Sequence, residues 1–248
     1  MFERKTFAHH YEGAIEPFKI IGNVYFVGCT PASSHLVDTG EGLILIDTGY
    51  LDTQFMIIDS IYKLGFSPYD IKYILHTHWH GDHTEASAGI AYLTGAKTII
   101  GEKDAEKVKK HFETDMTVKD GDIIELGNTK IEIMETPGHT EGCISFFLET
   151  EEDGKKYRVG MFGGAGANTL VPERFDYPDC REGYRNSLNR LRKEKVDVFI
   201  GNHVWNNDTE AKGKLLLETG ENKFIDDKIW NEFLDFCEKR LDETIARG

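Results

Sequence analysis

The sequence predicts an α/β fold in which two β-sheets pack face to face and helices cover their outer surfaces. Strand-like segments come first in hairpin-like groups and then alternate with helical segments, in both halves of the chain. No internal repeat, low-complexity stretch or Pro/Ser-rich linker divides the 248 residues. A chain of this length commonly forms one α/β domain, so we expect residues 1–248 to be a single domain.

Ten strands are expected from short β-branched or apolar runs bounded by Gly, Asn or Asp. They lie at 20–28, 34–38, 43–47, 73–76, 98–101, 123–126, 130–135, 144–149, 157–162 and 198–201. Between the expected strands at 144–149 and 157–162, the Glu152-Asp153-Gly154 segment predicts a tight hairpin turn.

Helices are expected where apolar residues recur with helical periodicity. This pattern is present at 53–64, 84–94, 103–112 and 183–193, and it is clearest near the end of the chain. There, one stripe is formed by Ile229, Trp230, Phe233, Cys237 and Leu241. We expect this stripe to pack in the core rather than to face a cofactor.

The amino-acid composition disfavours some classes of binding partner. Hydrophobic residues make up 40% of the chain, enough for a core, and 29 Lys and Arg against 43 Asp and Glu give a net charge of −14. Such a charge repels phosphate backbones and anionic lipid surfaces, so nucleic-acid and membrane partners are disfavoured. A small-molecule substrate is expected, and the oligomeric state is left open.

The expected compartment is the cytoplasm. The four cysteines are widely scattered and form no CxxC pair, which disfavours a disulfide framework. The N-terminal MFERKTFAHHYEG segment has no apolar h-region of a secretory signal, and no run of about 18 apolar residues is present.

A cluster of histidines is the main candidate for a functional site. His78, His80, Asp82 and His83 are potential metal ligands between an expected strand and an expected helix. Imidazole and carboxylate together suit zinc or another first-row divalent metal such as iron or manganese, and Gly81 lets the backbone turn tightly between them. His76 lies on the strand itself, where a packed or hydrogen-bonded role is favoured over ligation.

Two further histidines follow strands in the same way. His139 comes after the strand at 130–135, and His203 comes after the strand at 198–201. Taken singly, either would more often be a structural or surface residue. Because strand ends at one edge of an α/β sandwich form the usual site, three strand ends that finish in His favour a shared metal site.

With these motifs the sequence resembles the metallo-β-lactamase superfamily. The HWHGDH motif at 78–83 matches the signature of that superfamily, and LILIDTG at 43–49 and TPGHT at 136–140 resemble two further elements. His203 falls where the last histidine is expected, so the resemblance runs from about residue 20 to about residue 238. It is specific for the fold and much less so for the substrate.

The resemblance implies an αββα sandwich of two mixed sheets that holds two Zn²⁺ ions. The first ion would be bound by His78, His80 and His139, and the second by Asp82, His83 and His203. Many hydrolases of this superfamily, such as glyoxalase II and the lactonases, also have an Asp that bridges both metals. Here the corresponding FGGAGAN segment at 162–168 holds no carboxylate. In this respect, and in its C-terminal helical tail, the chain is similar to the third subclass of metallo-β-lactamases.

The reaction expected from the resemblance is hydrolysis by a dinuclear zinc enzyme. A metal-bound hydroxide, oriented by Asp82, would attack a carbonyl, with a cyclic amide of the β-lactam type as the first candidate substrate. Hydrolysis of a lactone or thioester, an iron-dependent persulfide dioxygenase and a non-enzymatic binding module are the alternatives. The third subclass has serines where this chain has the Gly- and Ala-rich loop, a longer insertion where it has 112–122, and an export signal.

Four residues are candidates for supporting roles. Asp47, at the end of an expected buried strand, is a candidate to hydrogen-bond a metal-bound histidine, to cap the turn through Thr48, or to do both. Trp79, Asn168 and Trp205 are candidates to contact the substrate. For the two tryptophans, ordinary packing is an equal alternative.

Overall fold

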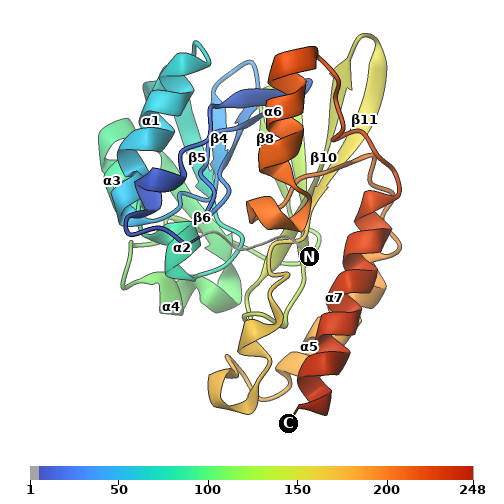
Figure 1. The fold of residues 1–248 in the computed structure, drawn as a ribbon. Coiled ribbons are helices and arrows are strands. Elements are labelled where there is room, and N and C mark those ends of the chain that lie inside the picture. Colours follow the sequence, from blue (N-terminus) through green and yellow to red (C-terminus); the bar gives the residue numbers. More distant parts are fainter. Residues whose placement is uncertain (1–5, 248) are drawn as a thin grey trace.

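Two mixed sheets form the centre of the computed structural model, which describes residues 6–247 (Figure 1). The first sheet has seven strands in sequential order, antiparallel from β1 to β4 and parallel from β4 to β7. These strands are β1 (Phe18–Ile21), β2 (Val24–Phe26), β3 (His35–Asp38), β4 (Leu43–Ile46), β5 (Ile71–Leu75), β6 (Lys97–Gly101) and β7 (Met116–Val118).

The second sheet has five strands in the order β12-β11-β10-β9-β8. Only the β11–β12 pair is parallel. The strands are β8 (Ile123–Leu126), β9 (Thr129–Glu135), β10 (Ile144–Glu152), β11 (Lys155–Met161) and β12 (Val198–Phe199). The predicted hairpin turn joins β10 to β11, and Asp153 and Gly154 adopt positive φ angles of 51° and 74° there. Both central residues of a type I′ turn need this geometry.

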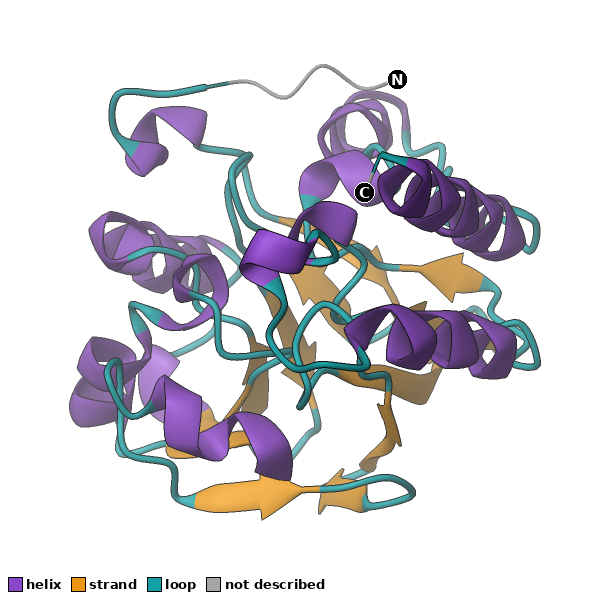
Figure 2. Ribbon diagram, turned by 90° about the horizontal axis from the view of Figure 1, so that it is seen from below, coloured by secondary structure: helices purple, strands orange, loops and turns teal. Residues whose placement is uncertain are grey.

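Helices lie outside both sheets, as Figure 2 shows from below. They are α1 (Gln54–Lys63), α2 (Gly81–Thr84), α3 (Ser87–Thr94), α4 (Ala105–Val108), α5 (Cys180–Leu191), α6 (Thr209–Thr219) and α7 (Ile229–Ala246). None of the helices among residues 6–247 is both long enough and apolar enough to cross a membrane. The expectation about an N-terminal targeting segment rests partly on residues 1–5, which lie outside the described range.

Strand alternation builds three apolar layers. In β4, Ile44 and Ile46 face the core between the sheets, whereas Leu43 and Leu45 face α1 and α3. In β10, Phe146 belongs to the inter-sheet core, and its neighbour Phe147 packs against α5 and α7. The αββα sandwich and its two mixed sheets are therefore confirmed.

The C-terminal stripe is part of the core, as expected. Trp230, Phe233, Cys237 and Leu241 of α7 are buried against α5 and the second sheet, and Ile229 is partly buried beside them. The four cysteines are buried and free.

Several boundaries differ from the prediction. The expected strand at 20–28 is a hairpin, because Gly22 adopts a φ of 51° and turns the chain between β1 and β2. The expected helix at 84–94 is shortened to α3, because Thr84 is the last residue of α2, and the one at 103–112 is reduced to α4 and a short 3₁₀ turn. The segments β7 and α6 were not predicted. Because the buried residues of α6 are Thr209 and Gly213, this helix carries no apolar stripe that a sequence pattern would detect.

Candidate metal centre

The strand directions bring the predicted ligands to one edge of the sandwich. In the first sheet, β4 and β5 run parallel and end just before Asp47 and His76. In the second sheet, β9 runs parallel to β11 and β12, because each of β9 and β11 is antiparallel to β10. His139 and His203 follow the ends of β9 and β12, so their loops open at the same edge.

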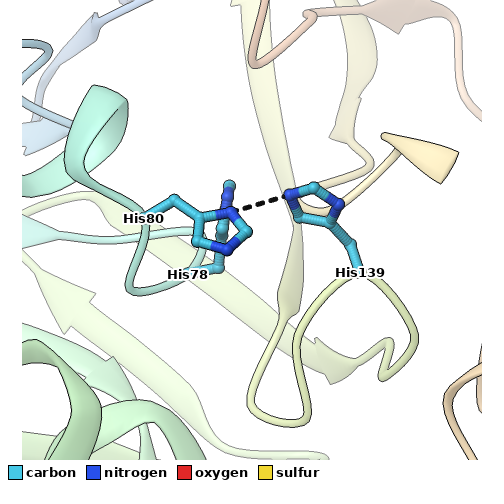
Figure 3. Close-up of side chains that lie close together, drawn as sticks. All are labelled: His78, His80 and His139. Carbon is cyan, nitrogen blue, oxygen red and sulfur yellow. Dashed lines mark hydrogen bonds between the residues drawn. The ribbon is translucent and has the colours of Figure 1, made fainter. Parts of the chain in front are cut away.

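Three histidines form a first group (Figure 3). His78 and His80, from the turn after β5, point toward His139 from the loop after β9. The Nδ1 atom of His80 lies 2.9 Å from the Nε2 atom of His139, and one nitrogen of each of the three rings lies within 4.8 Å of the others. His78 is buried, and its Nε2 atom has no partner within the described chain.

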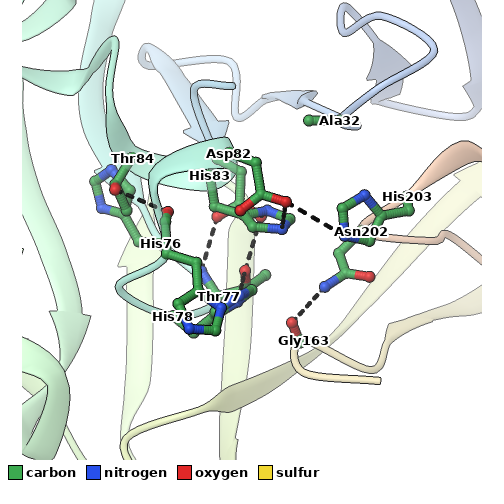
Figure 4. A network of polar contacts seen from close by, with 12 residues as sticks. Ala32, His76, Thr77, His78, Asp82, His83, Thr84, Gly163, Asn202 and His203 are labelled. Carbon is green, nitrogen blue, oxygen red and sulfur yellow. Dashed lines mark hydrogen bonds and ion pairs between the residues drawn. The ribbon is translucent and has the colours of Figure 1, made fainter. Parts of the chain in front are cut away.

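Asp82, His83 and His203 form the adjacent group (Figure 4). The Oδ2 atom of Asp82 lies 3.6 Å from Nε2 of His83 and 3.7 Å from Nε2 of His203. The two groups are continuous, because the rings of His78 and His83 have centroids 4.3 Å apart. All six predicted ligands are therefore brought together.

Hydrogen bonds at the outer ring nitrogens fix which nitrogen faces the centre. His83 donates from Nδ1 to Asp47 Oδ2 at 2.7 Å, and His139 donates from Nδ1 to the carbonyl of Gly166 at 2.7 Å. His203 donates from Nδ1 to the carbonyl of Pro31 at 3.2 Å. In a neutral imidazole the remaining Nε2 then carries the lone pair, which is the form that binds a metal.

Asp47 serves both groups. Besides His83, its carboxylate accepts hydrogen bonds from the backbone N–H of Thr77 and from the Thr77 hydroxyl, both at 2.8 Å. The same hydroxyl oxygen lies 3.0 Å from Nδ1 of His78, which donates to it. Asp47 is buried and has a φ of 56°, so its backbone turns in the left-handed region as it holds these side chains. The hydrogen bonds of the Asp47 carboxylate go to His83 and Thr77 rather than to the turn through Thr48.

The electrostatics keep most of these imidazoles neutral. Burial, with the neighbouring histidines, lowers the pKa of His80 to about 3 and that of His78 well below its usual value. Burial also lowers the pKa of His139 to about 4. The pKa of His83 is raised, because the carboxylates of Asp82 and Asp47 outweigh the effect of burial. Neutral imidazoles at neutral pH are ready to bind a cation without first losing a proton.

Asp82 is the anionic member of the cluster. Burial acts to raise its pKa, but His83, His203 and the other histidines outweigh burial and lower the value to about 2. The side chain is still 23% exposed, whereas His83 is fully buried. A charged carboxylate in contact with solvent therefore lies beside five imidazoles.

The two tryptophans contact the ligands directly. Trp205 stacks on the His203 ring, with centroids 4.2 Å apart and planes within 13°. Trp79 packs against α4 and donates its indole N–H to Asp176 at 3.2 Å. Both are partly buried, whereas Asn168 is exposed next to the loop that holds His139.

The glycine-rich loop after β11 lies against the ligand loops. A Cβ atom at Gly163 would overlap the carbonyl of Ile144, and one at Gly164 would lie 3.1 Å from Cβ of His139. The loop therefore approaches His139 through backbone atoms alone. His76 is buried and hydrogen-bonded to Ile99 and Ser87, as expected.

Three contributors were not identified from the sequence. Thr77 links Asp47 to His78, and Thr169 donates its hydroxyl to the carbonyl of His139 at 2.8 Å. Asp104 accepts hydrogen bonds from both ligand loops. Thr77 lies between two histidines of the motif, which is a usable signal, whereas Thr169 and Asp104 carry none because their contacts arise only from the fold.

Fold and site together define a class of protein. The profile of the metallo-β-lactamase superfamily matches residues 27–203, and the chain belongs to this superfamily. Within it, the chain is similar to the subclass B3 metallo-β-lactamase BJP-1 of Bradyrhizobium japonicum, at 30% identity and a TM-score of 0.90, over 96% of each chain. It is also similar to the class B3 di-zinc metallo-β-lactamase LRA-12 from an Alaskan soil metagenome, at 28% identity and a TM-score of 0.83, over 98% and 99% of the two chains.

Curated relatives carry a different name. A hydroxyacylglutathione hydrolase of Hyphomonas neptunium is 37% identical over 175 residues, which are 70% of this chain and 61% of the relative. The chain spans 34% to 61% of the length of the first three curated relatives it matches. The likeness to the B3 structures extends over nearly the whole chain, and the likeness to these hydrolases over a part of it.

The donor set fits divalent metal ions. The buried Nε2 atom of His78 lies in a group of neutral imidazole nitrogens, beside a carboxylate. Such nitrogens are the usual ligands of zinc, and the rings of His78 and His139 are also held from behind by hydrogen bonds to Thr77 and Gly166. An unpaired buried nitrogen costs free energy that a bound cation would offset.

Proposed function

We propose that the protein is a hydrolase that uses two divalent metal ions, most simply zinc. The proposal rests on the two adjoining groups of inward-facing donors, His78, His80 and His139 in one and Asp82, His83 and His203 in the other. Divalent cations bound there would polarise a carbonyl and activate water for attack on it. The similarity to a di-zinc B3 enzyme supports the same assignment.

The residues of the chain orient the reaction. Asp82 is anionic, partly exposed and close to His83 and His203, so a carboxylate oxygen of Asp82 can accept a hydrogen bond from the attacking water. Asp47 and Thr77 keep His83 and His78 in fixed orientations. Fixed groups lower the barrier because little reorganisation remains to be done in the transition state.

A cyclic amide of the β-lactam type is the first candidate substrate. The Gly163–Gly164 backbone occupies the position after β11, where the 162–168 segment contains no Asp or Glu. Similarity to B3 enzymes over nearly the whole chain supports this choice. A thioester is the second candidate, because the Hyphomonas neptunium relative is named hydroxyacylglutathione hydrolase.

A hydrolysis screen of the zinc-loaded protein separates these candidates. The panel contains a chromogenic cephalosporin, a glutathione thioester and an acyl-homoserine lactone, with metal content measured on the same sample. We expect two zinc ions per chain and turnover of the cephalosporin. Turnover of the thioester or lactone alone would replace the first candidate, and one iron per chain in the protein as purified, before zinc loading, would contradict the two-metal proposal.

A further inference from the structure

We propose that Asp104 is a positioning residue that holds the two loops of the first ligand group at a fixed separation. The proposal rests on the metal centre proposed above. Asp104 follows β6, contributes no atom to either ligand group, and lies more than 20 residues from each loop in sequence. Its carboxylate nevertheless contacts both loops.

The contacts of Asp104 fall next to ligands. Its Oδ2 atom accepts a hydrogen bond from the backbone N–H of Trp79 at 3.1 Å and from the hydroxyl of Thr140 at 2.6 Å. Its Oδ1 atom accepts one from the backbone N–H of Gly142 at 2.8 Å. Trp79 immediately precedes His80, and Thr140 immediately follows His139. One carboxylate thus joins the two loops whose His80 and His139 nitrogens lie 2.9 Å apart.

The backbone at the end of β6 packs closely against the backbone of the 140–142 loop, where Asp104 makes its contacts. A Cβ atom at Gly142 would lie 2.6 Å from Cγ of Asp104, and one at Gly101 would overlap the carbonyl of Gly142. The end of β6 therefore meets the 140–142 loop without a side chain in between. Asp104 itself is fully buried, so its carboxylate cannot exchange these donors for water.

The second ligand group is held differently. His83 is oriented by Asp47, and His203 by the carbonyl of Pro31, so neither depends on a hydrogen bond to Asp104. Loss of the Asp104 contacts should consequently weaken the binding of one metal ion much more than the other. General loss of stability would not produce this selectivity.

The test compares zinc affinities of the whole protein and its Asp104→Asn variant by competition with a chromogenic chelator. The amide replaces one acceptor oxygen by a donor that faces other donors, so at least one hydrogen bond is lost. Loss of an outer hydrogen bond costs metal affinity by about 10- to 100-fold. We expect this loss for one of two zinc ions, with a changed visible absorption when Co²⁺ replaces zinc.

Asp115→Asn, at an exposed position away from the metal centre, is the control. Asp115 also accepts hydrogen bonds from a threonine N–H and hydroxyl, those of Thr98 at 2.8 and 2.9 Å, but at the opposite end of β6. We expect its zinc affinities and Co²⁺ spectrum to match those of the unmodified protein. An equal loss of affinity in Asp115→Asn would overturn the positioning role.

A milder variant keeps the test decisive if Asp104→Asn does not fold. Thr140→Val removes only the hydroxyl donor and should weaken the same zinc ion. Two tightly bound zinc ions in the unmodified protein, with unchanged affinities in the variants, would overturn the role of Asp104 and leave the metal centre intact. No zinc uptake by the unmodified protein would instead overturn the proposed function, and the role of Asp104 with it.

Discussion

At the scale of single residues, neighbouring groups give similar side chains different properties. Asp82 and Asp47 are both carboxylates beside His83, yet Asp82 is partly exposed and faces the cluster, whereas Asp47 is buried behind it. The first can contact a substrate or water, and the second can act only through the histidine and Thr77 that it holds.

Replacing Asp82 by Asn tests the first role. Because the amide carries no charge and is a poorer acceptor, we expect kcat to fall by about 100-fold or more. Steady-state kinetics on the substrate found in the screen, with zinc content measured in parallel, provide the measurement. Asp227→Asn, at an exposed acidic position in the segment before α7, is the control. Unchanged kcat at unchanged zinc content would contradict the role.

The buried His35 should make the free energy of unfolding depend on pH. It is fully buried, and burial lowers its pKa to about 4, partly offset by Asp47. In the unfolded chain the pKa of His35 returns to its usual value. Between pH 4 and about 6.5 the unfolded state therefore binds more protons than the folded state. The free energy of unfolding should therefore rise with pH across this window, by up to about 1.4 kcal/mol per pH unit from this residue.

The variant His35→Phe isolates that contribution. The His35 ring meets Phe26 edge to face at 5.7 Å, and its two nitrogens have no hydrogen-bond partner in the part of the chain that is described. Urea unfolding of the metal-free protein between pH 4 and 7 should show a smaller slope for His35→Phe than for the unmodified chain. Parallel curves for the two proteins would contradict the assignment.

At the scale of elements, the best-predicted segments are those with strong apolar periodicity. The α7 stripe was visible because the core lies on one side of this helix, and β10 was visible as an apolar run that is buried on both faces. The turn of the β1–β2 hairpin was not visible because Gly22 lies within one apolar run, and β7 and α6 were not visible because each buries few apolar side chains. A sequence pattern reports burial, and it misses elements that bury little.

The candidate site was also predicted only in part from the sequence. The six donors are brought together where their motifs placed them, since each follows a recognisable strand. The residues that hold them, such as Thr169 and Asp104, become apparent only through hydrogen bonds between segments far apart in sequence. Pairings of this kind follow from the register of two sheets, which the sequence alone does not reveal.

Leu241 tests the packing of α7. The side chain is fully buried in the layer between α7, α5 and the second sheet, so Leu241→Ala should lower the free energy of unfolding by about 2–5 kcal/mol. On the same helix, Ile245 is 40% exposed, and Ile245→Ala should cost about 0.5 kcal/mol. Chemical denaturation of both variants measures the difference, and equal losses would contradict the packing.

At the scale of the whole molecule, one apolar core joins the two sheets. It contains Phe26 and Ile46 from the first sheet and Ile133, Phe146 and Val159 from the second. Neither sheet can lose this core without exposing the other, so we expect one cooperative unfolding transition for the chain. Calorimetry would show equal calorimetric and van't Hoff enthalpies, and two separate transitions would contradict a single domain.

Removal of metal should lower the melting temperature of the whole chain. The donors come from loops of both sheets, so the complete site exists only in the folded state, and a ligand that binds only this state stabilises it. We expect chelator treatment to lower the Tm and added Zn²⁺ to restore it. A Tm that does not respond to either would contradict the metal centre.

The bare-backbone contact between Gly101 and Gly142 has a practical consequence for protein engineering. A library intended to change substrate preference can randomise exposed positions such as Asn168, but it should leave both glycines and Asp104 as they are. Any side chain added at either glycine would push the two loops apart. Variants would then be lost through weaker metal uptake, and a screen for new activity would wrongly count them as failures of substrate recognition.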